Sequence, residues 1–160
     1  MTHNNQAEEL WRAYLASLPA GSAPPDRYEA WAFGDNPAMA DALADLVLRG
    51  IKTATASLLW EYEADGDPLP RAGDFSLILD GAGAPVCVIQ TTQVEVMAFS
   101  QVDAGWAYDE GEGDRSLQYW REGHWRFFSR WCERIGRTPS ETMPVVCERF
   151  KVVFKNKGKG

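Results

Sequence analysis

The sequence predicts an α+β fold, a small curved β-sheet or barrel with helices packed outside it. Three observations support this class. Helical periodicity occupies the first fifty residues, strand-like patterns then dominate to about residue 98, and one more helical pattern precedes a last strand. This order lacks the regular alternation of a parallel α/β sheet. With 160 residues, of which 45% are hydrophobic, the chain is long enough for one ordinary globular core.

Two helices are predicted in the first fifty residues. The first can be capped by Asn4 or Asn5, carries apolar residues at helical spacing and ends in a connector rich in proline. The second has stronger signals, because Asn36 is a good N-cap and Pro37 suits the first helical position. Gly50 follows where a left-handed residue commonly ends a helix.

The strand predictions rest on four segments separated by turn residues. They are "TATASLLW", "FSLIL" after the turn "RAGD", "VCVIQTTQVEVM" after the turn "DGAGAP", and "MPVVCERFKVVF" near the end. Between the last two lies a helix that Asp114 can cap and Gly136 can stop, with His124 on its apolar stripe. The final residues, "NKGKG", are expected to be disordered.

Composition narrows the classes of partner. The formal net charge of −7 argues against binding to duplex DNA or to anionic lipid, both of which need a basic face. It leaves RNA open, because a local basic surface works independently beyond a Debye length of about 8 Å. Arginines gather between residues 115 and 137. No apolar run is long enough to span a membrane.

Cysteine and histidine usage indicates a reduced, cytoplasmic protein without a zinc site. The three cysteines form no CxxC pair, and we find no signal peptide. The two histidines lie far apart in the sequence, which makes a preformed zinc site unlikely to arise from them.

The segment "RGIKTATAS" raises the first question of function. A regular strand would place Thr53, Thr55 and Ser57 on one face and Lys52 on the other. For Lys52 and Thr55 to converge, the chain must bend near Gly50, so the lysine should leave the junction between helix and strand.

The chemistry of this lysine depends on its neighbours. Burial lowers the pKa of a lysine and can make it a base, whereas a nearby carboxylate keeps it charged. A charged Lys52 would hold a phosphate or stabilise an oxyanion, and a neutral one could activate Thr55 as a nucleophile. The sequence leaves both alternatives open.

Four segments together resemble the ASCH domain family. They are "GIKTATAS", "RAGDFSLILDGAGAPVCVIQTTQVEV", "DEGEGDRSLQYWREGHWRFF" and "MPVVCERFKVVF". The resemblance covers about residues 28–154 and implies a small β-barrel related to the PUA RNA-binding domains. Residues 1–27 then form an N-terminal helical extension, and residues 155–160 form the disordered tail.

The resemblance implies RNA or a modified nucleoside as the partner and suggests two hydrolytic activities. One is cleavage of single-stranded RNA, and the other is amide hydrolysis of N4-acetylcytidine. By motif, the working residues are Lys52, Thr55 and a glutamate of the acidic segment (residues 109–114, "DEGEGD"). Glu112 matches better than Glu110. An arginine that the compact amidohydrolases carry after the motif is replaced here by "AS", which counts against the amidohydrolase specificity.

We therefore predict a ribonuclease, with an N4-acetylcytidine amidohydrolase and a non-catalytic RNA-binding module as alternatives. The predicted catalytic residues are Lys52, Thr55 and Glu112. The one cofactor that the sequence suggests is a divalent ion, which Glu112 and Asp114 could hold against a phosphate to assist the cleavage. Further side chains are candidates for substrate binding, the tryptophans by stacking on bases: Thr53, Ser57, Trp31, Trp60, Glu110, Asp114, His124, Arg126 and Ser129.

Overall fold

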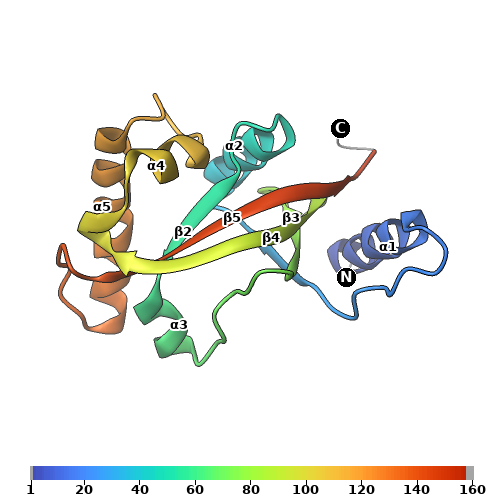
Figure 1. Cartoon of the computed structure of the whole chain (residues 1–160), viewed down its shortest axis with the longest axis horizontal. Helices are drawn as coiled ribbons and strands as arrows, with labels where there is room; N and C mark the ends of the chain where they lie inside the picture. Colours follow the sequence, from blue (N-terminus) through green and yellow to red (C-terminus); the bar gives the residue numbers. More distant parts are fainter. Residues whose placement is uncertain (1, 158–160) are drawn as a thin grey trace. The chain divides into compact units, whose positions relative to one another are not determined.

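The computed structural model describes residues 2–157, and their side chains from residue 5 onward. Helices and strands follow one another as the order in Figure 1 shows. The elements are α1 (Thr2–Ser17), β1 (Glu29–Ala32), α2 (Pro37–Leu48), β2 (Ala54–Leu58), α3 (Leu59–Asp65), β3 (Phe75–Leu79), β4 (Pro85–Ala98), the 3₁₀ turn η1 (Phe99–Gln101), α4 (Ala104–Glu110), α5 (Leu117–Ile135) and β5 (Pro144–Lys155).

The described strands form one mixed sheet in the order β1-β3-β4-β5-β2. β1 pairs with β3 in parallel, whereas the β3–β4 and β2–β5 pairs are antiparallel. Two of these three strand pairs are antiparallel, which distinguishes the sheet from that of a parallel α/β protein, and the predicted α+β class is confirmed.

The chain divides into two compact units. The first comprises residues up to 50, 73–91 and from 150 onward, and the second comprises residues 51–72 and 92–149. Because β4 and β5 each continue through the boundary residues, both strands belong partly to each unit.

In the first unit, two clusters of buried apolar residues hold the helices on their strands. Side chains of α1 pack with Leu77 and Val88 in one cluster, and side chains of α2 pack with Ile78 and Ile89 in the other. The capping of α2 is as predicted, because Asn36 Oδ1 accepts a hydrogen bond of 2.9 Å from the Met39 amide.

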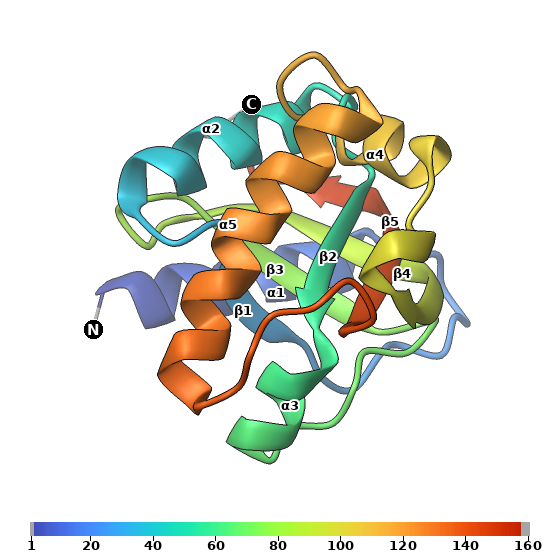
Figure 2. The ribbon, with the colours of Figure 1, turned by 90° about the vertical axis from the view of Figure 1, so that its left-hand side faces the viewer.

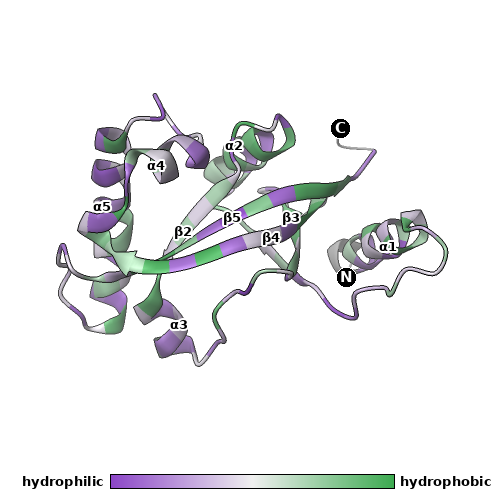
Figure 3. Ribbon diagram, in the orientation of Figure 1, coloured by the Kyte–Doolittle hydropathy of each residue, from purple (hydrophilic) through white to green (hydrophobic). Residues whose placement is uncertain are grey.

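In the second unit, α5 packs over β2 around one apolar cluster, as Figure 2 shows for the two elements. The cluster includes Leu58 of β2, Trp120, Phe128 and Cys132 of α5, and Val145 of β5. Hydrophilic and hydrophobic residues alternate along α5 in Figure 3, as its predicted apolar stripe requires. This helix forms one wall of the site described below.

Several predicted boundaries are wrong. α1 begins at Thr2, so Asn4 and Asn5 lie within the helix and do not cap it. The predicted strand "TATASLLW" ends at Leu58, and the residues after it form α3. Short apolar runs fit a strand and a buried helix equally well, which explains this error.

Three short elements were not predicted at all, namely β1, η1 and α4. The cap of α5 is also different from the prediction. Ser116 Oγ accepts the Tyr119 amide at 3.0 Å, and Asp114 instead accepts the Ser116 amide at 2.9 Å from outside the helix. Asp114 therefore shapes the turn before α5 and is not its N-cap.

At the end of the chain, β5 extends to Lys155, and Asn156 is hydrogen-bonded to Val86 and Pro85. These two residues of the predicted tail are therefore ordered, and residues 158–160 lie outside the described part. Across residues 2–157, we find no helix long and apolar enough to cross a membrane.

Candidate functional site

Lys52 lies in the short link between the end of α2 and the start of β2, which is the junction predicted for it from the sequence. The link is tied to the acidic segment, because the Thr53 amide donates to the Asp109 carbonyl oxygen at 2.7 Å. The lysine side chain points inward and is only 1% exposed. A lysine with so little exposure needs anionic partners or must lose its proton.

Two acids of the acidic segment provide these partners. Lys52 Nζ lies 2.8 Å from Glu112 Oε2 and 3.3 Å from Glu110 Oε1. It also lies 3.4 Å from the Glu110 carbonyl oxygen. The Lys52 amine therefore contacts both candidate glutamates, which lie some sixty residues further along the sequence.

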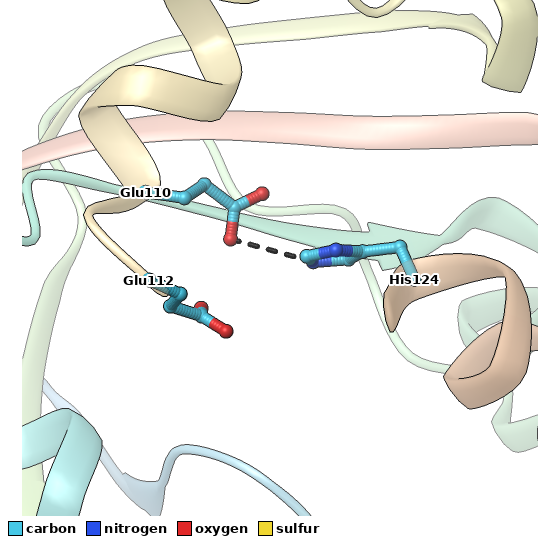
Figure 4. Close-up of side chains that lie close together, drawn as sticks. All are labelled: Glu110, Glu112 and His124. Atoms are coloured by element: carbon cyan, nitrogen blue, oxygen red, sulfur yellow. Dashed lines mark ion pairs between the residues drawn. The ribbon is translucent and has the colours of Figure 1, made fainter. Parts of the chain in front are cut away.

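Four charged side chains lie together and are called the Lys52 group below: Lys52, Glu110, Glu112 and His124. Glu110, the last residue of α4, is the buried centre of this group. Its side chain is 3% exposed, and its Oε2 accepts a hydrogen bond of 2.5 Å from Trp120 Nε1. Its Oε1 lies 3.4 Å from His124 Nε2, the ion pair drawn in Figure 4. Both oxygens of Glu110 are thus occupied by donors from Lys52 and α5.

His124 is oriented by its own helix. Its ring stacks on that of Trp120 at a centroid distance of 4.2 Å, and its Nδ1 lies 2.9 Å from the Trp120 carbonyl oxygen. A carbonyl oxygen only accepts, so Nδ1 carries a proton. Because Nε2 faces the Glu110 carboxylate, a second proton there makes the ring a cation.

The charges of the group reinforce one another. Burial lowers the pKa of Lys52, but the charges and hydrogen bonds of Glu110 and Glu112 outweigh burial and raise it above its usual value. Burial likewise lowers the pKa of His124, and Glu110 raises it above its usual value. Burial raises the pKa of Glu110, but the cations of His124 and Lys52 bring it down to about 2.

These shifts decide between the two alternatives for the lysine. At neutral pH Lys52 is an ammonium group held by two carboxylates, and Glu110 is ionised. The arrangement suits stabilisation of negative charge and does not suit a neutral lysine base.

Close backbone packing fixes the acidic segment against the lysine link. Gly111 has a φ of +73°, and a Cβ added there would lie 2.6 Å from the Ile51 carbonyl oxygen. Arg115, itself at a φ of +65°, donates from Nε to the Tyr108 carbonyl oxygen at 3.0 Å and from Nη2 to that of Ile51 at 3.4 Å. Glycine at 111 and the arginine together keep Glu110 and Glu112 within reach of Lys52.

The group does not fit a divalent metal ion as it stands. Glu110, Glu112 and His124 offer ligand atoms within 4.8 Å of one another. Both Glu110 oxygens already accept donors, however, and the Lys52 ammonium occupies the space beside Glu112. A divalent ion about 4 Å from that ammonium would be repelled by roughly 8 kcal/mol at an effective dielectric of about 20. Asp114, the other predicted metal ligand, is exposed and bound to the Ser116 amide.

The three hydroxyl side chains that follow Lys52 have different partners. Thr53 Oγ1 donates to the Asp109 carbonyl oxygen at 3.4 Å and helps to fix the link. Thr55 is half-buried in β2 and is paired across the sheet with Glu148 of β5. Ser57 is hydrogen-bonded to the Tyr62 hydroxyl at 2.9 Å, so its partner belongs to α3.

The remaining predicted binding residues lie outside the Lys52 group. Trp60 packs on the apolar cluster of the second unit, with the Arg137 guanidinium 4.6 Å above its ring. Trp31 belongs to the first unit, where it packs edge-on against Phe33. Two lie along α5: Arg126, which is exposed, and Ser129, whose buried Oγ has no partner among the described residues.

Sequence reasoning missed two residues that shape the site. Trp120 donates a hydrogen bond to Glu110, and Arg115 holds the acidic segment against the lysine link. The buried acid Glu148, which pairs across the sheet with Thr55, was also not predicted. Trp120 is one of the buried residues of α5, and the spacing of apolar residues predicts burial of such a ring but not the direction of its N–H group.

The fold and the site define an α+β domain whose buried lysine pairs with a distant acidic segment. A family model described as the ASCH domain matches residues 29–154, and the chain belongs to this family. ASCH domains are generally PUA-like and bind RNA.

Solved structures agree with this assignment. The chain is similar to an ASCH domain from Lactobacillus crispatus JV V101, with 36% identity, a TM-score of 0.89, and coverage of 94% of this chain and 95% of that one. It is also similar to a protein from Enterococcus faecalis V583, with 34% identity, a TM-score of 0.86, and coverage of 98% and 93%. The likeness confirms the predicted α+β barrel-type fold. The comparison with curated proteins found no match.

Proposed function

We propose that the chain cleaves single-stranded RNA, with Glu112 as the base that removes a proton from a 2′-hydroxyl group. The observation that carries this proposal is the unequal exposure of the Lys52 group. Glu112 is 25% exposed, whereas Lys52 and Glu110 are 1% and 3% exposed. Glu112 is thus the carboxylate that a substrate can reach, and the buried members hold it in place.

The fixed orientation of Glu112 supports its role as a base. Lys52 binds Oε2 at 2.8 Å. The other oxygen, Oε1, has no partner within the described part of the chain. A carboxylate held through one oxygen can accept a substrate proton with the other.

The cleavage step follows from these positions. Glu112 takes the 2′-hydroxyl proton while O2′ forms a bond to phosphorus, and the bond from phosphorus to O5′ breaks. The departing O5′ takes its proton from water, because both ring nitrogens of His124 are already bound to Glu110 and to the Trp120 carbonyl oxygen. The buried Lys52 ammonium stabilises the developing negative charge from a distance, through its electrostatic field. Water then opens the resulting cyclic phosphate, so the overall reaction is a hydrolysis.

The raised pKa of Lys52 disfavours the amidohydrolase alternative. In that reaction Lys52 would have to accept a proton from Thr55, and an ammonium group cannot do so. The ribonuclease reaction uses the charged lysine and is therefore the better match to the geometry.

The test compares cleavage of a labelled single-stranded RNA with that of DNA of the same sequence, which lacks the 2′-hydroxyl. We expect RNA alone to be cut, giving a cyclic phosphate end, with EDTA causing no loss. Glu112→Gln should reduce the rate by about 10²–10⁴-fold. Glu122→Gln, a change at an exposed glutamate of α5, is the matched control and should retain full activity.

Three results would point elsewhere. Cleavage of both RNA and DNA would exclude the 2′-hydroxyl mechanism. Release of acetate from N4-acetylcytidine, lost in Thr55→Ala, would support the amidohydrolase. Binding of RNA without turnover in any buffer would leave a non-catalytic RNA-binding domain.

A further inference from the structure

Two exposed tyrosines, Tyr108 and Tyr119, flank Glu112 in the sequence and lie outside the apolar core. Tyr108 of α4 is 56% exposed, and Tyr119 in the first turn of α5 is 47% exposed. Both contact the segment 111–115, in which Glu112 stands. Tyr119 rests on Gly113, and Tyr108 is covered by Arg115.

The ring of Tyr119 is held from one side. A Cβ built at Gly113 would lie 2.4–2.5 Å from three carbons of the Tyr119 ring, so only glycine leaves room for it. The backbone of Tyr119 is fixed as well, because the Tyr119 amide donates a hydrogen bond to Ser116 Oγ at 3.0 Å. One side of the ring thus contacts the loop, and nearly half of the residue remains in solvent.

Tyr108 and Arg115 form a second flat surface. The Arg115 guanidinium carbon lies 3.6 Å from the centroid of the Tyr108 ring, a stacked cation–π contact. Nε and Nη2 of the guanidinium are bound to carbonyl oxygens. Within residues 2–157 no group binds its Nη1, which is left to contact a ligand.

We propose that Tyr119 and the Tyr108–Arg115 pair stack the nucleobases that flank the phosphate cut beside Glu112. Each is an aromatic or guanidinium plane with a fixed orientation, and single-stranded RNA is bound through such planes. Both contact the segment that carries the proposed base, so bases stacked on them would bring a phosphate to Glu112. This inference rests on the proposed function and names the subsite for the substrate.

The test measures binding of a fluorescein-labelled hexa-adenylate by anisotropy, in a Glu112→Gln parent that cleaves it at least about a hundredfold more slowly than the wild type. Stacking contributes about 1–3 kcal/mol per base, so Tyr119→Ala should weaken binding by between about fivefold and 150-fold. Tyr119→Phe keeps the ring and should bind as the parent does. Val96→Ala, at a residue that is also 47% exposed, is the matched control.

A probe with abasic sites gives a second arm. The parent should bind the abasic probe more weakly by a similar factor, whereas Tyr119→Ala should lose little further affinity. The proposal is overturned if Tyr119→Ala and Tyr108→Ala both bind hexa-adenylate like the parent while the wild type still cleaves RNA. If the parent binds no RNA at all, the proposed function fails first, and the subsite fails with it.

Discussion

Replacing Lys52 by methionine should destabilise the protein strongly, and the loss should depend on pH. The change removes the amine but keeps an apolar stem of similar size. Glu110, 3% exposed, then keeps His124 and Trp120 as partners but loses the lysine cation. Removing one partner of a buried ion pair usually costs about 3–5 kcal/mol.

The pKa of Glu110 gives an independent estimate of the same size. The gap between an ordinary value of 4.5 and a value of about 2 corresponds to roughly 3 kcal/mol of stability, to which His124 and Lys52 both contribute. Because the folded-state pKa is depressed, this stability is present above pH 4.5 and is lost as the pH falls toward 2. Lys52→Met raises the pKa of Glu110, so the difference from wild type should be largest near pH 7.

Urea unfolding followed by tryptophan fluorescence measures this difference. We expect a loss of about 3–5 kcal/mol at pH 7 and a clearly smaller loss at pH 3. Lys151→Met, at an exposed lysine, should change little. A loss below about 1 kcal/mol, or an equal loss at both pH values, would refute the claim that the amine neutralises Glu110.

Three further predictions concern the groups around Lys52. Glu110→Gln should lower the pKa of His124 from its raised value, and a proton NMR titration that shows no change would contradict their ion pair. Trp120→Phe should cost about 1.5–3 kcal/mol of unfolding free energy, because a buried carboxylate loses its donor; wild-type stability would refute the contact. Gly111→Ala should lower the free energy of unfolding in urea by more than Gly66→Ala does. Both glycines have φ near +70°, but only a Cβ at residue 111 would press against a backbone oxygen. Equal losses in the two variants would contradict this close packing.

Much of the fold could be predicted from local patterns. The cap of α2 depends on residues next to each other. The strands β4 and β5 are long, and the short strand β3 is bounded by clear turn residues. β1 and α4 have only four and seven residues, too few for a period to be evident. The residues of α3 continue an apolar run from β2, and tertiary packing decides where the strand stops.

The site could be predicted in part, and the limit is physical. The junction position of Lys52 and its meeting with Glu112 follow from a bend and a motif in the right order. Whether Glu110 or Glu112 was the partner could not be decided, because both contact the amine and only their burial distinguishes them. The charge of Lys52 depends on distances, which a sequence does not contain.

The most direct test of the account is an NMR titration of the Lys52 side-chain nitrogen in the folded protein. We expect an ammonium signal with slow proton exchange at neutral pH, which persists above the ordinary lysine pKa of 10.5. In Glu112→Gln the pKa should fall. A Lys52 amine that loses its proton near pH 7 in the wild-type protein would contradict the account and would make the lysine a base.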